Sequence, residues 1–298
     1  MNEQSQLSQY RMNNMTDFCH IAPIDFLDLV KNRPAHLTLA HLVDTSNEYT
    51  EFYRAQDSSL NIMDNSAFEM YKQGKPMLTP MKVLEMASII KADYVVMSDY
   101  PGEHSSKTIQ AAIDLAPLFK SSGFGTFFVP QSQIGDKEDL INAFDWASTS
   151  KHVDYIGVSI LGVPNAYDVE RGNKLQRFVA RFMFMQELHD RGILHRIRKN
   201  KKKIHFLGMV DGPNEIKLME PYRDYIDTWD SSAGVWLGLN GRTFDGSPTG
   251  IIDGKFELEV DFDLKESEVS IDNYKLAKYN MDYIDSIVTK YLNDDSGY

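Results

Sequence analysis

The hydrophobic pattern of the chain alternates between two spacings. Short apolar runs, many of them rich in β-branched residues, end in polar residues, and segments with the apolar spacing of helices separate them. The runs cover residues 36–43, 60–64, 94–99, 126–131, 155–160, 204–209, 226–230 and 235–239. Strands that alternate with helices form parallel βαβ units, so these runs predict an α/β fold, a single (β/α)8 barrel of the TIM type.

The segments between the runs carry helix signals. Residues 79–91 open with Thr-Pro, an N-cap followed by proline at the first helical position, and residues 106–121 place apolar side chains on one stripe. Further helices are predicted over residues 137–150, 168–191 and 213–222. No GxGxxG sequence follows the first run, which argues against a dinucleotide-binding sheet.

The two ends of the chain depart from a plain barrel. We expect an N-terminal extension over residues 1–35, the barrel with the catalytic core over residues 36–240, and a C-terminal part over residues 241–298. Within the C-terminal part, residues 242–263 are Gly-rich and then alternate, which predicts a hairpin. Residues 271–292 predict a long amphipathic helix that closes the barrel or forms an oligomer contact.

Composition narrows the class of protein. The 298 residues are 42% hydrophobic and 25% charged, which is typical of a globular protein. A single cysteine, Cys19, excludes an intramolecular disulfide and a Cys-rich zinc site, and it favours a reducing compartment. No apolar run is long enough to span a membrane, and the polar N-terminal stretch lacks the apolar core of a secretory signal. We therefore expect a cytoplasmic protein, in the host cytoplasm if it is viral, with no membrane partner.

Acidic and amide side chains stand where several predicted strands end. Asp64, Asp99, Gln131 and Asp230 close the second, third, fourth and seventh runs. The carboxyl ends of barrel strands form one mouth, where barrel enzymes have their active sites. Carboxylates that converge there repel one another, so we expect a ligand or a cation to use them.

Two chemistries fit such a mouth. The carboxylates could hold a hard cation such as Mg²⁺, as in a metal-dependent TIM-barrel hydrolase, or two of them could cleave a glycosidic bond. Gln131, the backbone at Gly157 and the ring of Phe68 favour the second chemistry, because a planar heterocycle needs edge hydrogen bonds and a stacking face. The histidines show no metal-ligand spacing, so no metal site is predicted.

The order of the motifs at these strand ends resembles the tRNA-guanine transglycosylase superfamily. The usual motifs of that family are DSGG(F/Y)Q, a recognition Asp, and the segments VQG, IGG, YLMG and DxFDC. The corresponding segments here are Asp64-Asn65-Ser66-Ala67-Phe68, Asp99, Val129-Pro130-Gln131, Ile156-Gly157-Val158-Ser159, His205-Phe206-Leu207-Gly208 and Asp227-Thr228-Trp229-Asp230-Ser231. The resemblance covers residues 36–240.

The resemblance implies a role for each of these residues. Asp230 matches the nucleophile that attacks C1′ of the nucleotide, and Asp64 matches the acid/base that takes a proton from the incoming base. Such a double displacement needs no cofactor. The residues that match the base-binding positions are Asp99 and Gln131 for the edge of the heterocycle, Gly157 for a backbone hydrogen bond, and Phe68 and Leu207 for its two faces.

Departures from the family pattern indicate one branch of it. The enzymes that act on tRNA usually carry a zinc site of three cysteines and a histidine, which a chain with one cysteine cannot form. Ala67 stands at the second glycine of DSGG, Glu69 at the following Gln, and Ser231 at the Cys of DxFDC. The chain is most similar to the zinc-less phage and genomic-island enzymes of the DpdA type, which exchange guanine in DNA for a 7-deazaguanine such as 7-cyano-7-deazaguanine.

The resemblance therefore implies DNA as the favoured polymer, tRNA as the alternative, and the free 7-deazaguanine base as the second substrate. A homodimer or a helper protein could complete the complex. Two further hypotheses stay open, a non-catalytic accessory subunit that binds nucleic acid and the metal-dependent hydrolase.

Cationic side chains are the candidates for contact with the nucleic-acid backbone, although the net charge of −12 argues against non-specific coating. The basic run at residues 196–203 falls on the opposite face of the barrel and is expected to be a solvated loop. His205 and Asp227 are expected to have structural roles. The four candidates that follow the fifth predicted strand on the catalytic side are Arg171, Lys174, Arg177 and Arg181.

Overall fold

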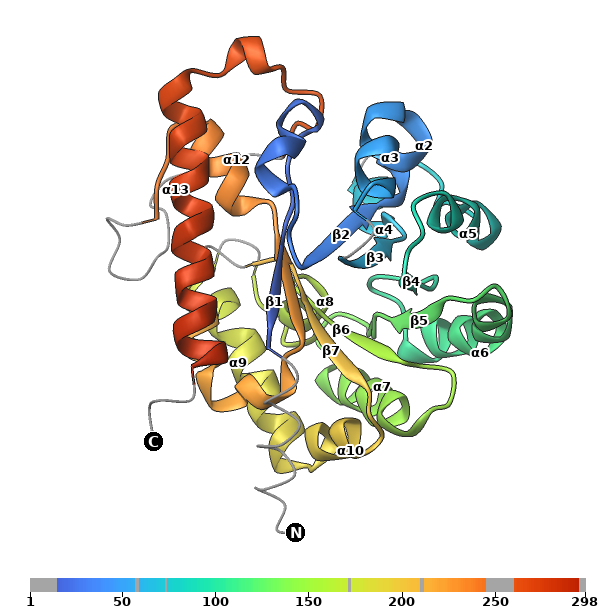
Figure 1. Cartoon of the computed structure of the whole chain (residues 1–298). Coiled ribbons are helices and arrows are strands. Elements are labelled where there is room, and N and C mark those ends of the chain that lie inside the picture. The colour runs from blue at the N-terminus through green and yellow to red at the C-terminus, as the bar shows by residue number, and fades with distance from the viewer. Residues whose placement is uncertain are drawn as a thin grey trace.

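Eight parallel strands form a nearly closed barrel in the computed structural model, which describes residues 15–56, 59–72, 74–170, 173–209, 212–244 and 260–294 (Figure 1). Along the sheet the strand order is β1-β8-β7-β6-β5-β4-β3-β2, so β1 and β2 are its two edges. The fold is a (β/α)8 barrel, as the alternating pattern predicts. The strands are β1 (Asp17–His20), β2 (Ala35–Leu39), β3 (Leu60–Asp64), β4 (Tyr94–Val96), β5 (Gly125–Phe128), β6 (Tyr155–Ser159), β7 (Lys203–Leu207) and β8 (Thr228–Ser231).

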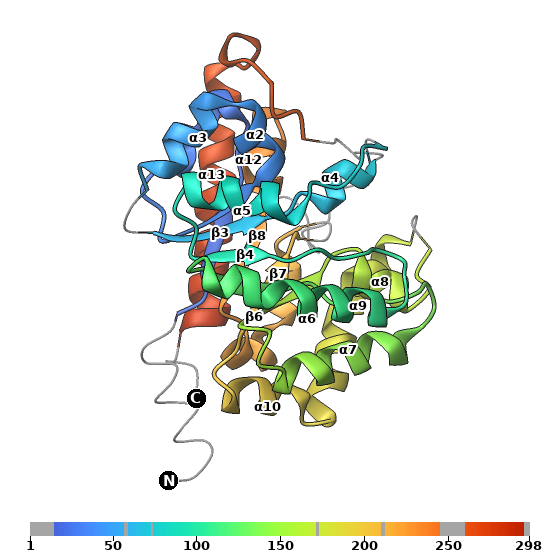
Figure 2. The ribbon, with the colours of Figure 1, turned by 90° about the vertical axis from the view of Figure 1, so that its right-hand side faces the viewer.

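Helices and short helical segments surround the barrel (Figures 1 and 2). The helix that follows Thr79 begins at the predicted cap, because the Thr79 side chain accepts a hydrogen bond from the Lys82 backbone. The helix predicted to begin at residue 168 begins after Asn173, whose side chain accepts a hydrogen bond from the Gln176 backbone. The α-helices are α2 (Ala40–Thr45), α3 (Asn47–Arg54), α4 (Ala67–Lys72), α5 (Pro80–Ile89), α6 (Ser105–Ser121), α7 (Lys137–Thr149), α8 (Gly162–Ala166), α9 (Lys174–Asp190), α10 (Ile193–Lys199), α11 (Asn214–Leu218), α12 (Ala233–Leu239) and α13 (Ile271–Ile287). The shorter segments are η1 (Ile24–Val30), η2 (Glu220–Tyr225), η3 (Glu266–Glu268) and the π-helical η4 (Val288–Asn293).

The register of the strands fixes which side chains fill the barrel. Residues paired across neighbouring parallel strands point to the same side of the sheet, and side chains alternate along each strand. Asp230 pairs with Cys19, and Asp64 pairs with Leu39, so all four lie on the inner side. The intervening residues, such as Trp229, pack outward against the helices and are fully buried. The carboxylates at the strand ends therefore point into the mouth of the barrel.

The structure corrects one of the eight predicted strands and adds one strand that the pattern did not predict. The first strand of the sheet, β1, lies within the segment predicted as an N-terminal extension, and the run at residues 235–239 is part of helix α12. The β1 sequence Asp-Phe-Cys-His is short, and its inward positions, Asp17 and Cys19, carry no strong apolar signal. The run at 235–239 is apolar because α12 is covered by α13: a Cβ at Gly238 would lie 2.2 Å from the Cα atom of Ala277.

The predicted C-terminal helix is confirmed as α13, which lies along α12 on the β1 side of the barrel (Figure 1). Asp285 of α13 accepts hydrogen bonds from the His20 ring at 2.8 Å and from the Arg33 guanidinium at 2.5 Å. Since His20 ends β1 and Arg33 precedes β2, this carboxylate joins the two edges of the sheet. Most of the hairpin predicted over residues 242–263 lies outside the described residues. In the described part of the chain, no helix has the length and apolarity to cross a bilayer.

A buried histidine makes the stability of the fold depend on pH. His36, on the outer side of β2, is 1% exposed and packs edge-on against Tyr53, with ring centroids 5.3 Å apart. Neither ring nitrogen has a hydrogen-bond partner among the described residues. Burial, assisted by the charge of Arg33, lowers the pKa of His36 to about 4 from the usual 6.5. The folded protein therefore binds this proton less readily than the unfolded chain does.

We expect the free energy of unfolding to fall as the pH drops from about 6.5 towards 4. At pH 5 the loss from His36 alone is about 2 kcal/mol relative to pH 7.5. Urea unfolding at the two pH values should show this difference in the wild-type protein and a smaller one in His36→Leu. His189→Ala, at an exposed histidine, is the control and should keep the wild-type difference. An unchanged pH dependence in His36→Leu would contradict the assignment.

Candidate active site at the carboxyl ends of the strands

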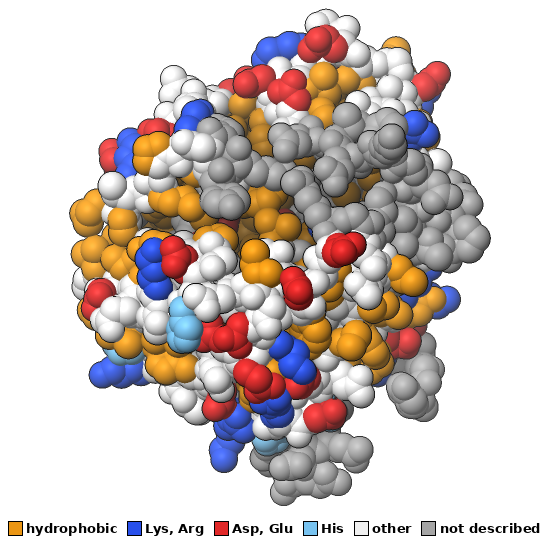
Figure 3. Space-filling model, turned by 180° about the vertical axis from the view of Figure 1, so that it is seen from behind, with side chains coloured by type: hydrophobic (Ala, Val, Ile, Leu, Met, Phe, Trp, Pro, Cys, Tyr) orange, Lys and Arg blue, Asp and Glu red, His pale blue; other side chains and the backbone are white. Residues whose placement is uncertain are grey.

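The predicted acidic residues meet at one end of the barrel. Helices α4 and α8 directly follow β3 and β6, and both project from the same side (Figure 2). The face opposite to that of Figure 1 is hollowed near its centre, and hydrophobic side chains border the hollow (Figure 3). Asp64 ends β3, Asp230 lies in β8, and Asp99 and Gln131 come a few residues after β4 and β5. Their positions match the arrangement expected from the sequence.

Asp230 is held through one of its two oxygens. Its Oδ1 atom lies 2.9 Å from Nε2 of His205 and accepts a hydrogen bond of 3.1 Å from the backbone N–H of Gly208. On the other side of the ring, Nδ1 of His205 lies 2.5 Å from Oγ1 of Thr228, which in turn lies 2.7 Å from the Tyr155 hydroxyl. With Nε2 donating to the carboxylate, the Thr228 hydroxyl donates to Nδ1. Among the described residues, both bonds to Asp230 go to Oδ1, which leaves Oδ2 for the mouth.

The surroundings of Asp64 favour the protonated form of its carboxyl group. Burial raises the pKa of Asp64 well above its usual range, and the charges of Glu69, Asp99 and Asp230 raise it further. A hydrogen bond of 2.8 Å from the backbone N–H of Ser66 to Oδ2 opposes that rise. The charges of Asp99 and Asp230 thus act on the Asp64 carboxyl group from the same end of the barrel.

Asp99 and Gln131 form a buried polar pair. The side-chain amide of Gln131 donates to Oδ2 of Asp99 at 2.7 Å, and the amide of Asn65 donates to Oδ1 at 2.9 Å. Asp99 is 6% exposed and Gln131 4% exposed, so burial raises the pKa of Asp99 while the two hydrogen bonds lower it. The pair presents a fixed set of polar atoms beside Asp64, because Asn65 follows Asp64 directly in the chain.

The predicted apolar contacts lie at the same mouth. Phe68, on α4, is 39% exposed, and Leu207 is half-buried at the end of β7. Gly157 lies on β6, where a Cβ would come within 2.8 Å of the Phe127 ring and 2.9 Å of Leu207. The glycine is therefore required by packing inside the barrel, whether or not its backbone meets a ligand.

The prediction of Arg181 as a contact to the nucleic-acid backbone is wrong. Arg181 is fully buried in α9, and the carboxylate of Glu215 accepts from its Nε and Nη2 atoms at 2.6 and 2.7 Å. Its other N–H groups donate to the carbonyls of Val158, Leu207 and Gly208. All five guanidinium donors are used. Helical spacing placed Arg181 on the face of Arg177 but could not show that this face packs inward.

The remaining three cationic candidates stay predictions. Arg177 is partly exposed on α9. Lys174 is the first residue of α9, and Arg171 lies outside the described residues.

The basic run at residues 196–203 is structural rather than a loop. It spans the end of α10 and the start of β7. Arg198 donates to Asp227 at 2.6 Å, and Asp227 also accepts from the backbone N–H of Ile204, which confirms its structural role. Lys202 donates to the carbonyls of Ser150 and Val153, and burial lowers its pKa to about 8. These bonds fasten the amino ends of the strands.

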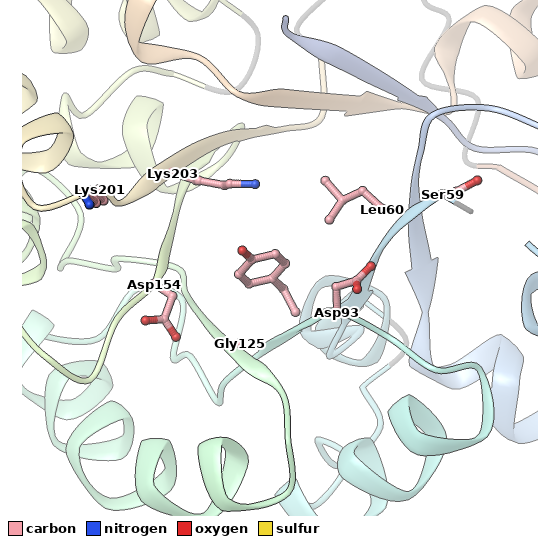
Figure 4. Close-up of a pocket in the computed structure, with 8 residues that line it drawn as sticks. Ser59, Leu60, Asp93, Gly125, Asp154, Lys201 and Lys203 are labelled. Atoms are coloured by element: carbon pink, nitrogen blue, oxygen red, sulfur yellow. The ribbon is translucent and has the colours of Figure 1, made fainter. Parts of the chain in front are cut away.

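A pocket of about 790 Å³ opens at the amino ends of the strands, away from Asp64, Asp99 and Asp230 (Figure 4). The Nζ atom of Lys203 lies over the rings of Tyr94 and Tyr155, 5.5 and 5.8 Å from their centroids. Asp93 and Asp154, also on its wall, accept backbone hydrogen bonds from Asn61 and Thr126. The two aspartates of this pocket therefore bind backbone N–H groups near the amino ends of β3 and β5.

Some residues of the mouth were not predicted. His205 was expected to be structural, but it also orients Asp230. The sequence marks Glu69 only as a departure from the family motif, yet among neighbouring charges that of Glu69 raises the pKa of Asp64 most. His41 gave no signal in the sequence, although its backbone N–H and its ring both contact Ser66. Only Glu69 had a usable signal, its position five residues after Asp64.

The fold and the mouth define a (β/α)8 barrel with a cluster of buried acidic and amide side chains at the carboxyl ends of its strands. A comparison with protein-family models and with curated protein sequences finds no match to this chain. Within the described ranges, no three His, Cys, Asp or Glu side chains are grouped so as to hold a metal ion.

Proposed function

We propose that the protein is a base-exchanging transglycosylase that replaces guanine in nucleic acid, with DNA favoured, by a 7-deazaguanine. The observation that carries the proposal is the contrast between two carboxyl groups at one mouth. Asp230 is held by donors through Oδ1, as a nucleophilic carboxylate requires, while burial and neighbouring charge favour the protonated form of Asp64. Carboxyl groups whose environments differ in this way are typical of glycosidic-bond chemistry.

In the first half of the reaction, Oδ2 of Asp230 attacks C1′ of the target nucleotide. The C1′–N9 bond breaks, the electron pair leaves with guanine, and Asp64 donates its proton to the departing base. In the second half, Asp64 takes a proton from N9 of the 7-deazaguanine, and N9 displaces Asp230 from C1′. Two inversions give net retention. Proton and charge balance without a redox cofactor or ATP.

The other residues of the mouth suit the recognition of a flat base. The Asp99–Gln131 pair offers donors and acceptors for the edge of a heterocycle, and Phe68 and Leu207 offer apolar contact for its faces. A base in a duplex must leave the stack to reach such a site, at a cost of a few kcal/mol. Single-stranded DNA should therefore react faster than duplex DNA.

The test is incorporation of isotope-labelled 7-cyano-7-deazaguanine into single-stranded DNA, duplex DNA and tRNA, read by mass spectrometry of the nucleosides. We expect labelled nucleoside from DNA, undiminished by EDTA. Incorporation into tRNA alone would move the activity to the alternative polymer, and loss with EDTA would favour the metal-dependent hydrolase. DNA binding without incorporation into any polymer would support the accessory subunit and overturn the proposal.

A further inference from the structure

The turn after Asp64 holds a residue in an uncommon backbone conformation. Ser66 is fully buried and has φ of +58°, in the left-handed region that residues other than glycine seldom adopt. This conformation is sterically unfavourable for a serine, because its Cβ approaches the following carbonyl oxygen. Backbone strain of this kind persists only where neighbouring groups enforce it, and it concentrates at functional sites.

The groups that contact the Ser66 side chain both belong to His41 of helix α2. The backbone N–H of His41, near the start of α2, donates to Oγ of Ser66 at 3.1 Å, and Nδ1 of the His41 ring lies 2.9 Å from the same oxygen. Asp64 and Leu39 are register partners in β3 and β2, so α2 begins beside the turn. The Oγ atom of Ser66 thus contacts two nitrogen atoms of His41, a residue distant in the sequence.

The His41 ring that contacts Ser66 is uncharged at neutral pH. Burial lowers the pKa of His41 to about 4, assisted by the charge of Lys75, so the ring is neutral at pH 7. The Ser66 oxygen accepts from the backbone N–H of His41, and the tautomer of the neutral ring sets which atom donates in the bond between Nδ1 and Oγ. The ring itself lies edge-on to Phe262, with centroids 5.9 Å apart.

The turn places a hydrogen-bond donor next to the carboxyl group of Asp64. In the left-handed conformation the backbone N–H of Ser66 points back to Oδ2 of Asp64, at 2.8 Å. Asn65, between them, is fixed on its other side by donating to the Met97 carbonyl and to Asp99. With Oδ2 occupied by the backbone, Oδ1 of Asp64 is the oxygen available for proton transfer.

We propose that His41 and Ser66 are positioning residues for Asp64: His41 holds Ser66 in the left-handed conformation, and the backbone of Ser66 thereby orients the carboxyl group that moves the proton. The inference rests on the proposed function for its catalytic meaning. Its structural content, the link from His41 to Asp64 through the Ser66 turn, can be measured on its own.

The link predicts a specific pattern of rescue. His41→Ala should lower kcat/KM for base exchange about 10- to 100-fold, because a misdirected catalytic group loses its near-attack geometry. Glycine adopts positive φ without a steric penalty, so a Gly at position 66 keeps the turn without help from His41. The double variant His41→Ala/Ser66→Gly should therefore regain most of the activity. In the Ser66→Gly background, His41→Ala should cost less than about threefold.

The pKa of Asp64, followed by ¹³C NMR of labelled aspartate carboxyls, gives a reading that needs no substrate. Loss of the Ser66 N–H bond removes a group that stabilises the carboxylate, so the pKa of Asp64 should rise in His41→Ala and return in the double variant. Ser66→Ala, which keeps the strain but loses both bonds to His41, should raise the pKa of Asp64 at least as far as His41→Ala does, and it serves if that variant does not fold. His189→Ala, at an exposed histidine, is the control and should leave both readings unchanged.

The outcomes separate the inference from the proposed function. An equal loss from His41→Ala in the wild-type and Ser66→Gly backgrounds would mean that His41 acts on the substrate directly, which overturns the positioning role. An unshifted pKa of Asp64 in both His41→Ala and Ser66→Ala would overturn it as well. If instead Asp64→Asn exchanges bases as fast as the wild type, the proposed function fails, whatever the NMR reading.

Discussion

Replacing Asp230 by asparagine should abolish base exchange and leave the fold intact. The amide oxygen can still accept from the His205 ring and the Gly208 N–H, so the local hydrogen bonds survive. The amide cannot form the ester with C1′, and loss of a nucleophile of this kind lowers kcat by about 10⁴-fold or more. Single-turnover exchange with labelled 7-deazaguanine measures the rate. A denaturing gel of protein with oligonucleotide alone should show a covalent adduct for the wild type and none for Asp230→Asn.

A matched control is Asp145→Asn, at an aspartate on α7 whose partner is Arg196 on the outer surface. This variant should form the adduct and exchange bases at the wild-type rate. An adduct that forms equally well in Asp230→Asn would identify another residue as the nucleophile.

Replacing Arg181 by methionine should destabilise the protein by about 3–5 kcal/mol. Glu215 is fully buried, so the change removes the guanidinium that faces a buried carboxylate, and it removes donors from the carbonyls of Val158, Leu207 and Gly208. The midpoint of urea unfolding at pH 7.5 measures the effect. Activity should fall with it, since Gly208 also donates to Asp230.

Two comparisons make this expectation specific. Arg191→Met removes a surface arginine that pairs with Glu138 and Glu187, and should cost no more than about 1 kcal/mol. The double variant Arg181→Met/Glu215→Leu should recover part of the loss, because no unpaired charge remains buried. An Arg181→Met protein within 1 kcal/mol of the wild type would mean that the buried pair contributes little.

The sequence predicted the barrel and the acidic mouth because both follow from local rules. Alternating spacings identify βαβ units, and parallel strands bring their carboxyl ends to one side, so Asp64, Asp99 and Asp230 were placed together without coordinates. The same rules failed at the ends of the sheet. Strand β1 is short and turns polar residues inward, so it lacks the apolar alternation of a strand. Helix α12 is apolar on every side because another helix covers it, so it lacks the apolar stripe of a helix.

Within the mouth, residue types were easier to predict than their partners. The link from His205 to Asp230 depends on which way a side chain points inside the barrel. The side chain of Ser66 contacts His41, which is 25 residues earlier in the chain. Arg181 and Arg177 share a helical face. Only the packing of α9 on the strands shows that Arg181 is buried and Arg177 is partly exposed. These contacts form only in the tertiary structure, so no periodic pattern in the sequence predicts them.

The carboxylate of Asp285, which joins His20 to Arg33, has a consequence for biogenesis. Helix α13 follows the eight strands in chain order. All strands are therefore synthesised before Asp285, the residue that joins the β1 and β2 edges of the sheet. During that interval β1 and β2 present unpaired backbone groups, which are templates for pairing with another copy. The period between synthesis of β8 and docking of α13 is thus when self-association competes most strongly with folding, and when chaperone binding would be of greatest benefit.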